Sequence, residues 1–286
     1  MAGQGAILLC ALLWSTSGLF IKLTDWHPVV ISGGRSILAA GLLYALRFVR
    51  PGRNSANELI KLAACGFWYA ATMILFVTAN KLTASANAIL LQYAAPVWAA
   101  LLGRLVLRER PGWEHWCAFV PVCTGLFLVF SGGFAKGSFL GDTIALLSGI
   151  AFAANSVVLR KNKDGGTADI MLFSHIICAL FSVPFFFLYP PSLSAGNVLS
   201  VLFMGIFQMG AASVLFAYGI KRVPAVQAML TATIEPVLNP VWVLAVTGEK
   251  PSLSVLAGGS LVVAAVVFSS VIRYIPRLPP VIRRSP

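Results

Sequence analysis

Charged residues are scarce in this sequence. Only 10% of the 286 residues are Asp, Glu, Lys or Arg, and only nine residues are acidic. Hydrophobic residues make up 58% of the chain, and its mean hydropathy is +0.87. A soluble globule needs far more polar surface than this composition supplies. The composition therefore excludes a soluble globular protein and indicates an integral membrane protein.

Motifs for chemistry are also missing. The three histidines lie in separate segments, and there is neither an HExxH pair for a catalytic metal nor a GxxxxGK[ST] loop for a nucleoside triphosphate. The five cysteines fall in apolar runs without a CxxC or a Cys/His cluster, which predicts neither a metal site nor a disulfide framework. No set of nucleophile, base and oxyanion donors is recognisable. We therefore expect no enzyme activity, no catalytic residue, no metal and no cofactor.

Ten apolar runs fill most of the chain. A helix needs about 20 residues to cross a hydrocarbon core about 30 Å thick, and each run is close to that length. We predict an all-α integral membrane fold with ten transmembrane helices. The first run lacks a preceding basic segment, so we expect a retained helix and no cleaved signal peptide. The runs lie near residues 5–23, 28–48, 59–79, 84–107, 113–131, 141–159, 169–189, 198–219, 224–246 and 253–273.

Basic residues are divided unevenly between the two sides that ten spans define. Of the 21 Lys and Arg residues, only four fall on one side, and all the others except Arg35 fall on the other. Cytoplasmic loops collect Lys and Arg, so both termini are expected in the cytoplasm and most of the net charge of +12 is explained without nucleic acid. The tail 274–286, rich in Pro and Arg, is predicted to be cytoplasmic and to touch anionic headgroups. The four are Lys22, Lys81, Lys136 and Lys250.

The second half of the sequence repeats the first. A shift of 140 residues brings residues of the first half onto identical residues in the second. We predict two five-helix repeats, 1–131 and 141–273, joined by a linker at 132–140. Because five is odd, the second repeat should be inverted in the membrane, which points to a substrate site near the midplane that opens alternately to each side. Matched pairs are Phe76/Phe216, Ala71/Ala211, Lys81/Lys221, Ala88/Ala228, Pro96/Pro236, Glu109/Glu249 and Pro111/Pro251.

One acidic residue, Glu235, lies deep inside an apolar run. Thr231, Glu235 and Asn239 recur at i, i+4 and i+8, which places them on one face of a helix. Pro236 and Pro240 cannot donate backbone hydrogen bonds, so carbonyl acceptors are left open beside the carboxylate. An intramembrane carboxylate costs about 2.5 to 3.5 kcal/mol to insert and is therefore a candidate for function. We predict that these three residues bind substrate; the alternative is a structural Glu bonded to a neighbouring helix.

Other residues inside the spans are candidates for the same cavity. Arg35 lies roughly 10 Å deep in span 2, either in the cavity or reaching the interface with its stem. His175 matches Arg35 at the 140-residue shift and is either a protonatable group near the inner mouth or a hydrogen-bonding partner of another helix. Aromatic residues and amides such as Gln208, near the span centres, would suit an amphipathic solute, although most such aromatics only pack. The aromatic candidates are Trp14, Tyr69, Tyr93 and Phe152.

The order of these motifs resembles a known family. LLWS near the start, an Arg in span 2, Ala95-Pro96 and Arg108-Glu109-Arg110, followed by Glu235-Pro236 and Gly248-Glu249-Lys250, are similar to the paired EamA domains of the drug/metabolite transporter superfamily. The resemblance covers nearly the whole chain. It implies a ten-helix secondary transporter in which spans 1–4 and 6–9 surround a central cavity and spans 5 and 10 are peripheral. Such proteins typically export amino acids, related metabolites or drugs.

We therefore predict a secondary active transporter that exports small metabolites such as amino acids or similar zwitterions. Alternating access is expected, either coupled to protons or facilitative. The alternatives are an exporter of drugs or cationic aromatics, a membrane channel and a lipid flippase. Expected partners are a small-molecule substrate, the lipid bilayer and protons; no residue indicates an oligomer, although small-residue pairs would allow close helix packing. The expected location is a bacterial cytoplasmic (inner) membrane, crossed several times.

Overall fold

Helices are the only regular elements in the part of the chain that the structure describes. It is a computed structural model that describes residues 2–47, 56–106, 120–129, 138–161, 167–220, 222, 231 and 234–272. The predicted tail 274–286 and positions 132–137 of the predicted linker lie outside these residues. The all-α prediction is confirmed for the described residues.

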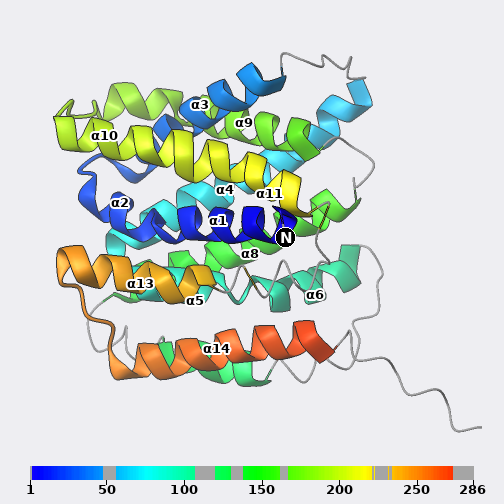
Figure 1. Cartoon of the computed structure of the whole chain (residues 1–286), viewed down its shortest axis with the longest axis vertical. Helices are drawn as coiled ribbons and strands as arrows, with labels where there is room; N and C mark the ends of the chain where they lie inside the picture. The colour runs from blue at the N-terminus through cyan, green and yellow to red at the C-terminus, as the bar shows by residue number, and fades with distance from the viewer. Residues whose placement is uncertain are drawn as a thin grey trace, which may run out of the picture.

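The helices run side by side, with their axes in roughly one direction (Figure 1). The first half contains α1 (Ala2–Ser15), α2 (Ser17–Leu23), α3 (Pro28–Arg47), α4 (Ala56–Leu82), α5 (Ser85–Gln92) and α6 (Ala95–Val106). A short helix, Val120–Val129, follows. The rest contains α8 (Phe139–Lys161), α9 (Thr167–Leu188), α10 (Ala195–Phe203), η1 (Met204–Ala211), α11 (Ala212–Ile220), α13 (Ile234–Thr247) and α14 (Leu253–Ile272).

Seven segments among the described residues are long and apolar enough to cross a membrane. Three shorter apolar helices accompany them, and all ten overlap the predicted runs in order. Helix α14 continues to Ile272 and reaches the length of a span, whereas the described parts of the other two are shorter, so the count of ten crossings remains a prediction. The seven are Ala2–Leu23, Pro28–Leu46, Leu62–Leu82, Ser85–Val106, Phe139–Val158, Asp169–Leu188 and Ala195–Phe216; the three are Val120–Val129, Ile234–Thr247 and Leu253–Ala265.

Three of the spans depart from a continuous α-helix. The first is interrupted at Thr16, between α1 and α2. The fourth is interrupted after α5, and α6 begins just before Pro96, whose missing N–H is tolerated in a first turn but not within a helix. The segment from α10 to α11 stays helical, but the eight residues of η1 form a π-helix. Short π-helical stretches occur frequently at functional sites.

The prolines of α13 sit differently from the predicted breaks. Pro236 falls in the first turn of α13, where the missing N–H costs nothing, and the helix continues past Pro240 to Thr247. Helix α13 therefore runs from the level of Glu235 to its end without interruption.

The two halves of the chain interlock. Helix α4 packs against α8 and α9, α3 packs against α9 and η1, and α1 packs against α11 and α13. The largest apolar cluster contains buried residues from both halves, among them Ile21, Ile89 and Met204, each with 0% exposure. The described core is therefore built jointly by both halves.

Helix α14 lies at the edge of the bundle, at the bottom of Figure 1. It meets the helix Val120–Val129 through two glycines: a Cβ on Gly258 would lie 2.5 Å from the carbonyl oxygen of Gly125, and a Cβ on Gly125 would lie 2.6 Å from that of Gly258. Small residues of this kind let helix backbones approach closely in membranes.

We expect Gly258→Ala to lower the stability of the protein by about 1 to 3 kcal/mol, because the added methyl group would meet backbone that cannot rotate away. The measurement is the thermal unfolding midpoint of the purified protein in detergent. Gly41→Ala is the matched control, since a Cβ at Gly41 has no atom within 4 Å. Equal midpoints for the two variants would contradict the close contact.

Candidate functional site

Glu235 and Tyr93, two of the predicted site residues, meet inside the bundle. Glu235 lies in the first turn of α13, and Tyr93 lies in the interruption between α5 and α6. The Tyr93 hydroxyl donates a hydrogen bond of 3.1 Å to Oε2 of Glu235. Among the described residues, Glu235 forms no ion pair. The acid is thus held by a neutral donor, and no described Lys or Arg offsets its charge.

Asn239 lies one turn further along α13, on the same face as Glu235. Its side chain is fully buried, and its Nδ2 donates a hydrogen bond of 3.1 Å to the Ser17 hydroxyl. Its Oδ1 finds no hydrogen-bond donor in the described part of the chain. Gly18 makes room for this amide, because a Cβ there would lie 2.4 Å from Oδ1. Asn239 therefore ties α13 to α2 and keeps one free acceptor.

The structure does not show whether Thr231 lies on the polar face predicted for Glu235 and Asn239. It precedes α13 and is partly exposed, and positions 232–233 between it and the helix lie outside the described residues. Whether Thr231 shares the face of Glu235 therefore remains a prediction.

Among the described residues, Trp14 and Phe152 make no hydrogen bond or ring contact with Glu235 or Asn239. The Trp14 ring packs against Phe216 of α11, with 5.5 Å between ring centroids. Phe152 is 46% exposed on α8, and among the described residues no ring contact links it to the other candidates. The first is a packing contact between the halves; a substrate role for either residue remains a prediction.

Arg35 is the centre of a second polar group. Its side chain has 0% exposure, which rules out the alternative in which its stem reaches the interface. Nη2 contacts the sulfur of Met73 at 3.4 Å, whereas Nε and Nη1 have no hydrogen-bond partner in the described residues. No carboxylate described in the structure pairs with it. A buried guanidinium without an acceptor is costly, so the site is suited to receiving an anionic group.

His175 and Tyr69 belong to this second group. Nε2 of His175 shares a hydrogen bond of 3.2 Å with the Tyr69 hydroxyl, and Nδ1 lies 3.4 Å from the Ser36 hydroxyl. The Tyr69 hydroxyl also lies 3.7 Å from the sulfur of Met209 in η1. His175 thus bonds neighbouring helices, which is the structural alternative for this residue, and it joins α9 to α3 and α4.

Gln208 is a stronger candidate for binding solute than the sequence indicated. It lies in η1 with 0% exposure, and neither Nε2 nor Oε1 has a hydrogen-bond partner among the described residues. An amide near a span centre is visible in the sequence, but most such amides find partners, as Gln92 does by donating to Ser148 at 2.8 Å. Only the structure identifies Gln208 as unpaired.

Known proteins share the fold and the sequence pattern of this chain. A crystal structure named only as that of a protein superposes with a TM-score of 0.69 at 20% identity, covering 96% of this chain and 98% of the other; this likeness concerns the fold alone. An "Uncharacterized transporter" of Archaeoglobus fulgidus is 27% identical over 271 residues, which cover 93% of this chain and 96% of that protein. The Bacillus subtilis "Uncharacterized transporter YwfM" is 28% identical, covering 92% of each chain.

A more distant match is the human "Solute carrier family 35 member G1", which is 26% identical over 58% of this chain and 49% of its own length. Residues 1–131 and 139–271 each match the pattern of one family, described as the EamA-like transporter family. These two matches cover most of the chain and confirm the resemblance seen in the motifs. The chain belongs to the EamA-like transporter family and is a multi-pass membrane transport protein.

Proposed function

We propose that the protein is a secondary active transporter that exports small zwitterionic metabolites, such as amino acids, by alternating access through a central cavity. One observation carries the proposal. The bundle holds a carboxylate, Glu235, and a guanidinium, Arg35, and neither forms an ion pair with a described residue. A zwitterion carries an ammonium group and a carboxylate that would offset both.

The energetic cost of these groups supports a functional role. An unpaired charge within a protein in a membrane costs several kcal/mol, so charges kept there are candidates for substrate or ion pathways. Glu235 is partly compensated by a neutral hydroxyl, and the Arg35 guanidinium has only a thioether. A bound solute would supply the interactions that the chain does not.

The packing of helices supports alternating access between inverted halves. Helix α1 packs on α11 and α13, and its repeat equivalent α8 packs on α4 and α6, the equivalents of those partners. Helix α3 packs on its own equivalent, α9. A two-fold relation between inverted repeats would produce this pairing. The distribution of Lys and Arg favours cytoplasmic termini in a bacterial inner membrane.

Glu235 offers a mechanism for proton coupling. A single carboxylate can hold a proton or the ammonium group of a solute, but not both at once. If protons enter as the solute leaves, this mutual exclusion links outward solute movement to inward proton movement.

The test uses purified protein in liposomes under an imposed pH gradient. Radiolabelled alanine, phenylalanine and glutamate are compared with tetraphenylphosphonium, a cationic aromatic. We expect saturable, gradient-driven accumulation and counterflow of at least one amino acid. Accumulation of tetraphenylphosphonium alone would instead identify a drug exporter, and flux without saturation or counterflow would identify a channel. Movement of labelled lipid without solute flux would identify a flippase.

A further inference from the structure

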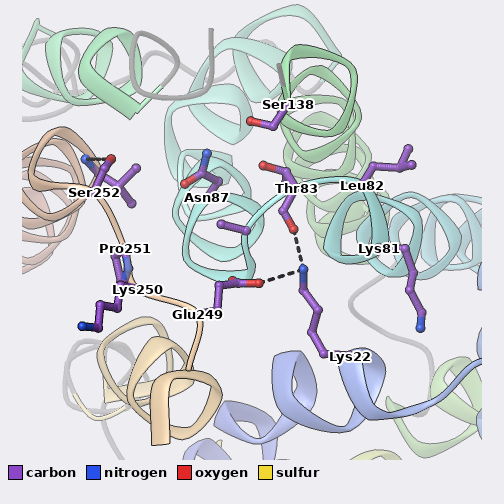
Figure 2. A pocket seen from close by; sticks show the side chains of 12 residues that line it. Lys22, Lys81, Leu82, Thr83, Asn87, Ser138, Glu249, Lys250, Pro251 and Ser252 are labelled. Atoms are coloured by element: carbon purple, nitrogen blue, oxygen red, sulfur yellow. Dashed lines mark hydrogen bonds and ion pairs between the residues drawn. The ribbon is translucent and has the colours of Figure 1, made fainter. Parts of the chain in front are cut away.

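A pocket of about 290 Å³ lies where the ends of several helices meet, on the side predicted to face away from the cytoplasm. Its walls come from the end of α2, the turn between α4 and α5, Ser138 before α8, and the connection between α13 and α14 (Figure 2). Pockets for drug-sized ligands have volumes of about 300 to 1,000 Å³. This pocket lies just below that range, so its size suits a small organic anion better than a large drug.

The pocket contains an ion pair between the two halves of the chain. Nζ of Lys22 lies 2.9 Å from Oε2 of Glu249 and donates a hydrogen bond of 2.8 Å to the carbonyl oxygen of Thr83. The other carboxylate oxygen, Oε1, accepts a hydrogen bond of 2.7 Å from the backbone N–H of Ser85, the first residue of α5. Both oxygens of Glu249 are thus bound, one by an ammonium group and one by a helix N-terminus, and both donors favour an anion.

Lys22 is the cation that reaches this carboxylate. Figure 2 shows its side chain extending toward Thr83 and Glu249, whereas the ammonium groups of Lys81 and Lys250 lie away from it at the rim. Lys81 donates a hydrogen bond to the carbonyl oxygen of Thr24 and interacts with Asp25, so the exposed Lys250 is the rim lysine that adds positive charge to the approach. Asp142 lies behind the wall, where its oxygens accept hydrogen bonds from Thr83, Asn87 and Ser138; these neutral donors hold it in place, and its charge offsets part of the positive charge of the pocket.

Glu249 can leave this position at low cost. The side chains of Lys22 and Glu249 are 21% and 28% exposed, and partly exposed ion pairs contribute only about 0 to 1 kcal/mol. Gly248 precedes Glu249 with a φ of +73°, a left-handed conformation that favours glycine, and no atom lies within 4 Å of the place of a Cβ there. No side chain therefore packs against this face of Gly248, and the turn is held by hydrogen bonds of 3.1 Å from the Gly248 N–H to the Leu244 carbonyl and of 3.3 Å from the Glu249 N–H to the Thr247 hydroxyl.

Glu249 is also connected to the proposed substrate group. It follows the end of α13 by two residues, and Glu235 lies in the first turn of the same helix. Release of Glu249 would remove one contact between the outer end of α13 and the elements that carry Lys22 and Ser85, α2 and α5, while the packing of α13 on both would remain. The ion pair therefore holds a helix of one half against the other at the outer mouth.

We propose that this pocket is a second solute site, in which the carboxylate of a small organic acid or amino acid replaces that of Glu249 on Lys22 and the Ser85 N–H. The solute is one that leaves through the outer mouth, so the identity of the ligand rests on the proposed function. Glu249 acts as a tethered competitor, and short tethers produce effective concentrations in the millimolar range. Free carboxylate must exceed that competition to bind.

The test measures binding of propionate to the purified protein in nanodiscs by ligand-observed NMR. We expect Glu249→Gln to bind propionate about tenfold more tightly than the parent, because the charged competitor on Lys22 is gone. Lys22→Gln should bind at least about tenfold more weakly, because the cation is gone. Lys250→Gln removes the same charge from the rim without touching the bound carboxylate, and a change below about threefold is expected.

Opposite signs for the first two variants are the decisive result. If Glu249→Gln and Lys22→Gln weaken binding equally, or if propionate never saturates, the ion pair is only structural and the site is wrong. Saturation by inorganic phosphate without propionate would overturn the ligand class. If Lys22→Gln fails to fold, the gain in Glu249→Gln decides alone.

Binding is measured without a gradient, so the two proposals fail separately. Loss of all transport with the expected binding pattern would contradict the proposed function only. Normal amino acid export without that pattern would contradict the outer site only.

Discussion

Glu235→Gln is expected to fold normally and to lose proton-driven accumulation of solute. Glutamine nearly matches glutamate in shape, and its carbonyl oxygen can still accept the hydrogen bond that Tyr93 donates at 3.1 Å. It cannot take up a proton or attract an ammonium group with a full charge. Both alternatives on which the coupling depends are therefore removed, while the contact between α13 and the α5–α6 interruption is kept.

The measurement compares gradient-dependent accumulation and its pH profile in liposomes for the two proteins. Tyr93→Phe is the complementary variant: it removes the hydrogen bond that Glu235→Gln keeps, and it keeps the carboxylate, so it should retain coupling. Accumulation in Glu235→Gln with the parental pH profile would make Glu235 a structural residue. Proton coupling would then have to come from another group or be abandoned.

Arg35→Lys is expected to impair transport although the positive charge is kept. The guanidinium is planar and offers two parallel donors to a carboxylate, whereas an ammonium group is a point charge on a different stem. Nε and Nη1 of Arg35 have no acceptor in the described residues. The parallel donor pairs of a guanidinium are Nε with Nη2 and Nη1 with Nη2, so a solute carboxylate would take one of these two donors together with the second N–H of Nη2. We expect a loss of at least about tenfold in kcat/KM, equivalent to about 1.4 kcal/mol.

The assay for Arg35 is initial transport rate against solute concentration, with the thermal unfolding midpoint as a check on folding. A structural role alone would lower the midpoint and the amount of active protein, leaving KM unchanged. An increase in KM at normal stability would support contact with the solute. Parental KM and rate in Arg35→Lys would remove the residue from the site.

Much of the helix pattern could be predicted from the sequence because the apolar runs are long. Pro96 falls in the first turn after the interruption of the fourth span, where its missing N–H costs no helical hydrogen bond. The sequence also identified Glu235 as a candidate site residue, because a carboxylate is rare in an apolar run. These features depend on local chemistry, which a sequence displays directly.

The features that could not be predicted depend on partners distant in sequence. Helical rise gave the depth of Arg35 but not its neighbours, so burial and access to the interface were both open until α4 and α9 were placed. The ion pair of Lys22 and Glu249 joins residues 227 positions apart, and neither residue alone predicts the other. The π-helix at Met204–Ala211 has no signature in the hydrophobic pattern.

The π-helix η1 lies in the middle of the eighth apolar run, between α10 and α11, where a change of its hydrogen-bond pattern would rotate one end of the run relative to the other. In η1 each N–H reaches a carbonyl five residues back, and in the α-helices on either side it reaches four. Rewinding η1 from one pattern to the other would turn α11 about its own axis relative to α10, with both ends still attached. Helix α11 packs on α1 through Phe216 and Trp14, so a rotation of α11 would move α1 in the first half of the chain. A change within η1 would thus rotate α11 relative to α10 without a hinge at either end of the span.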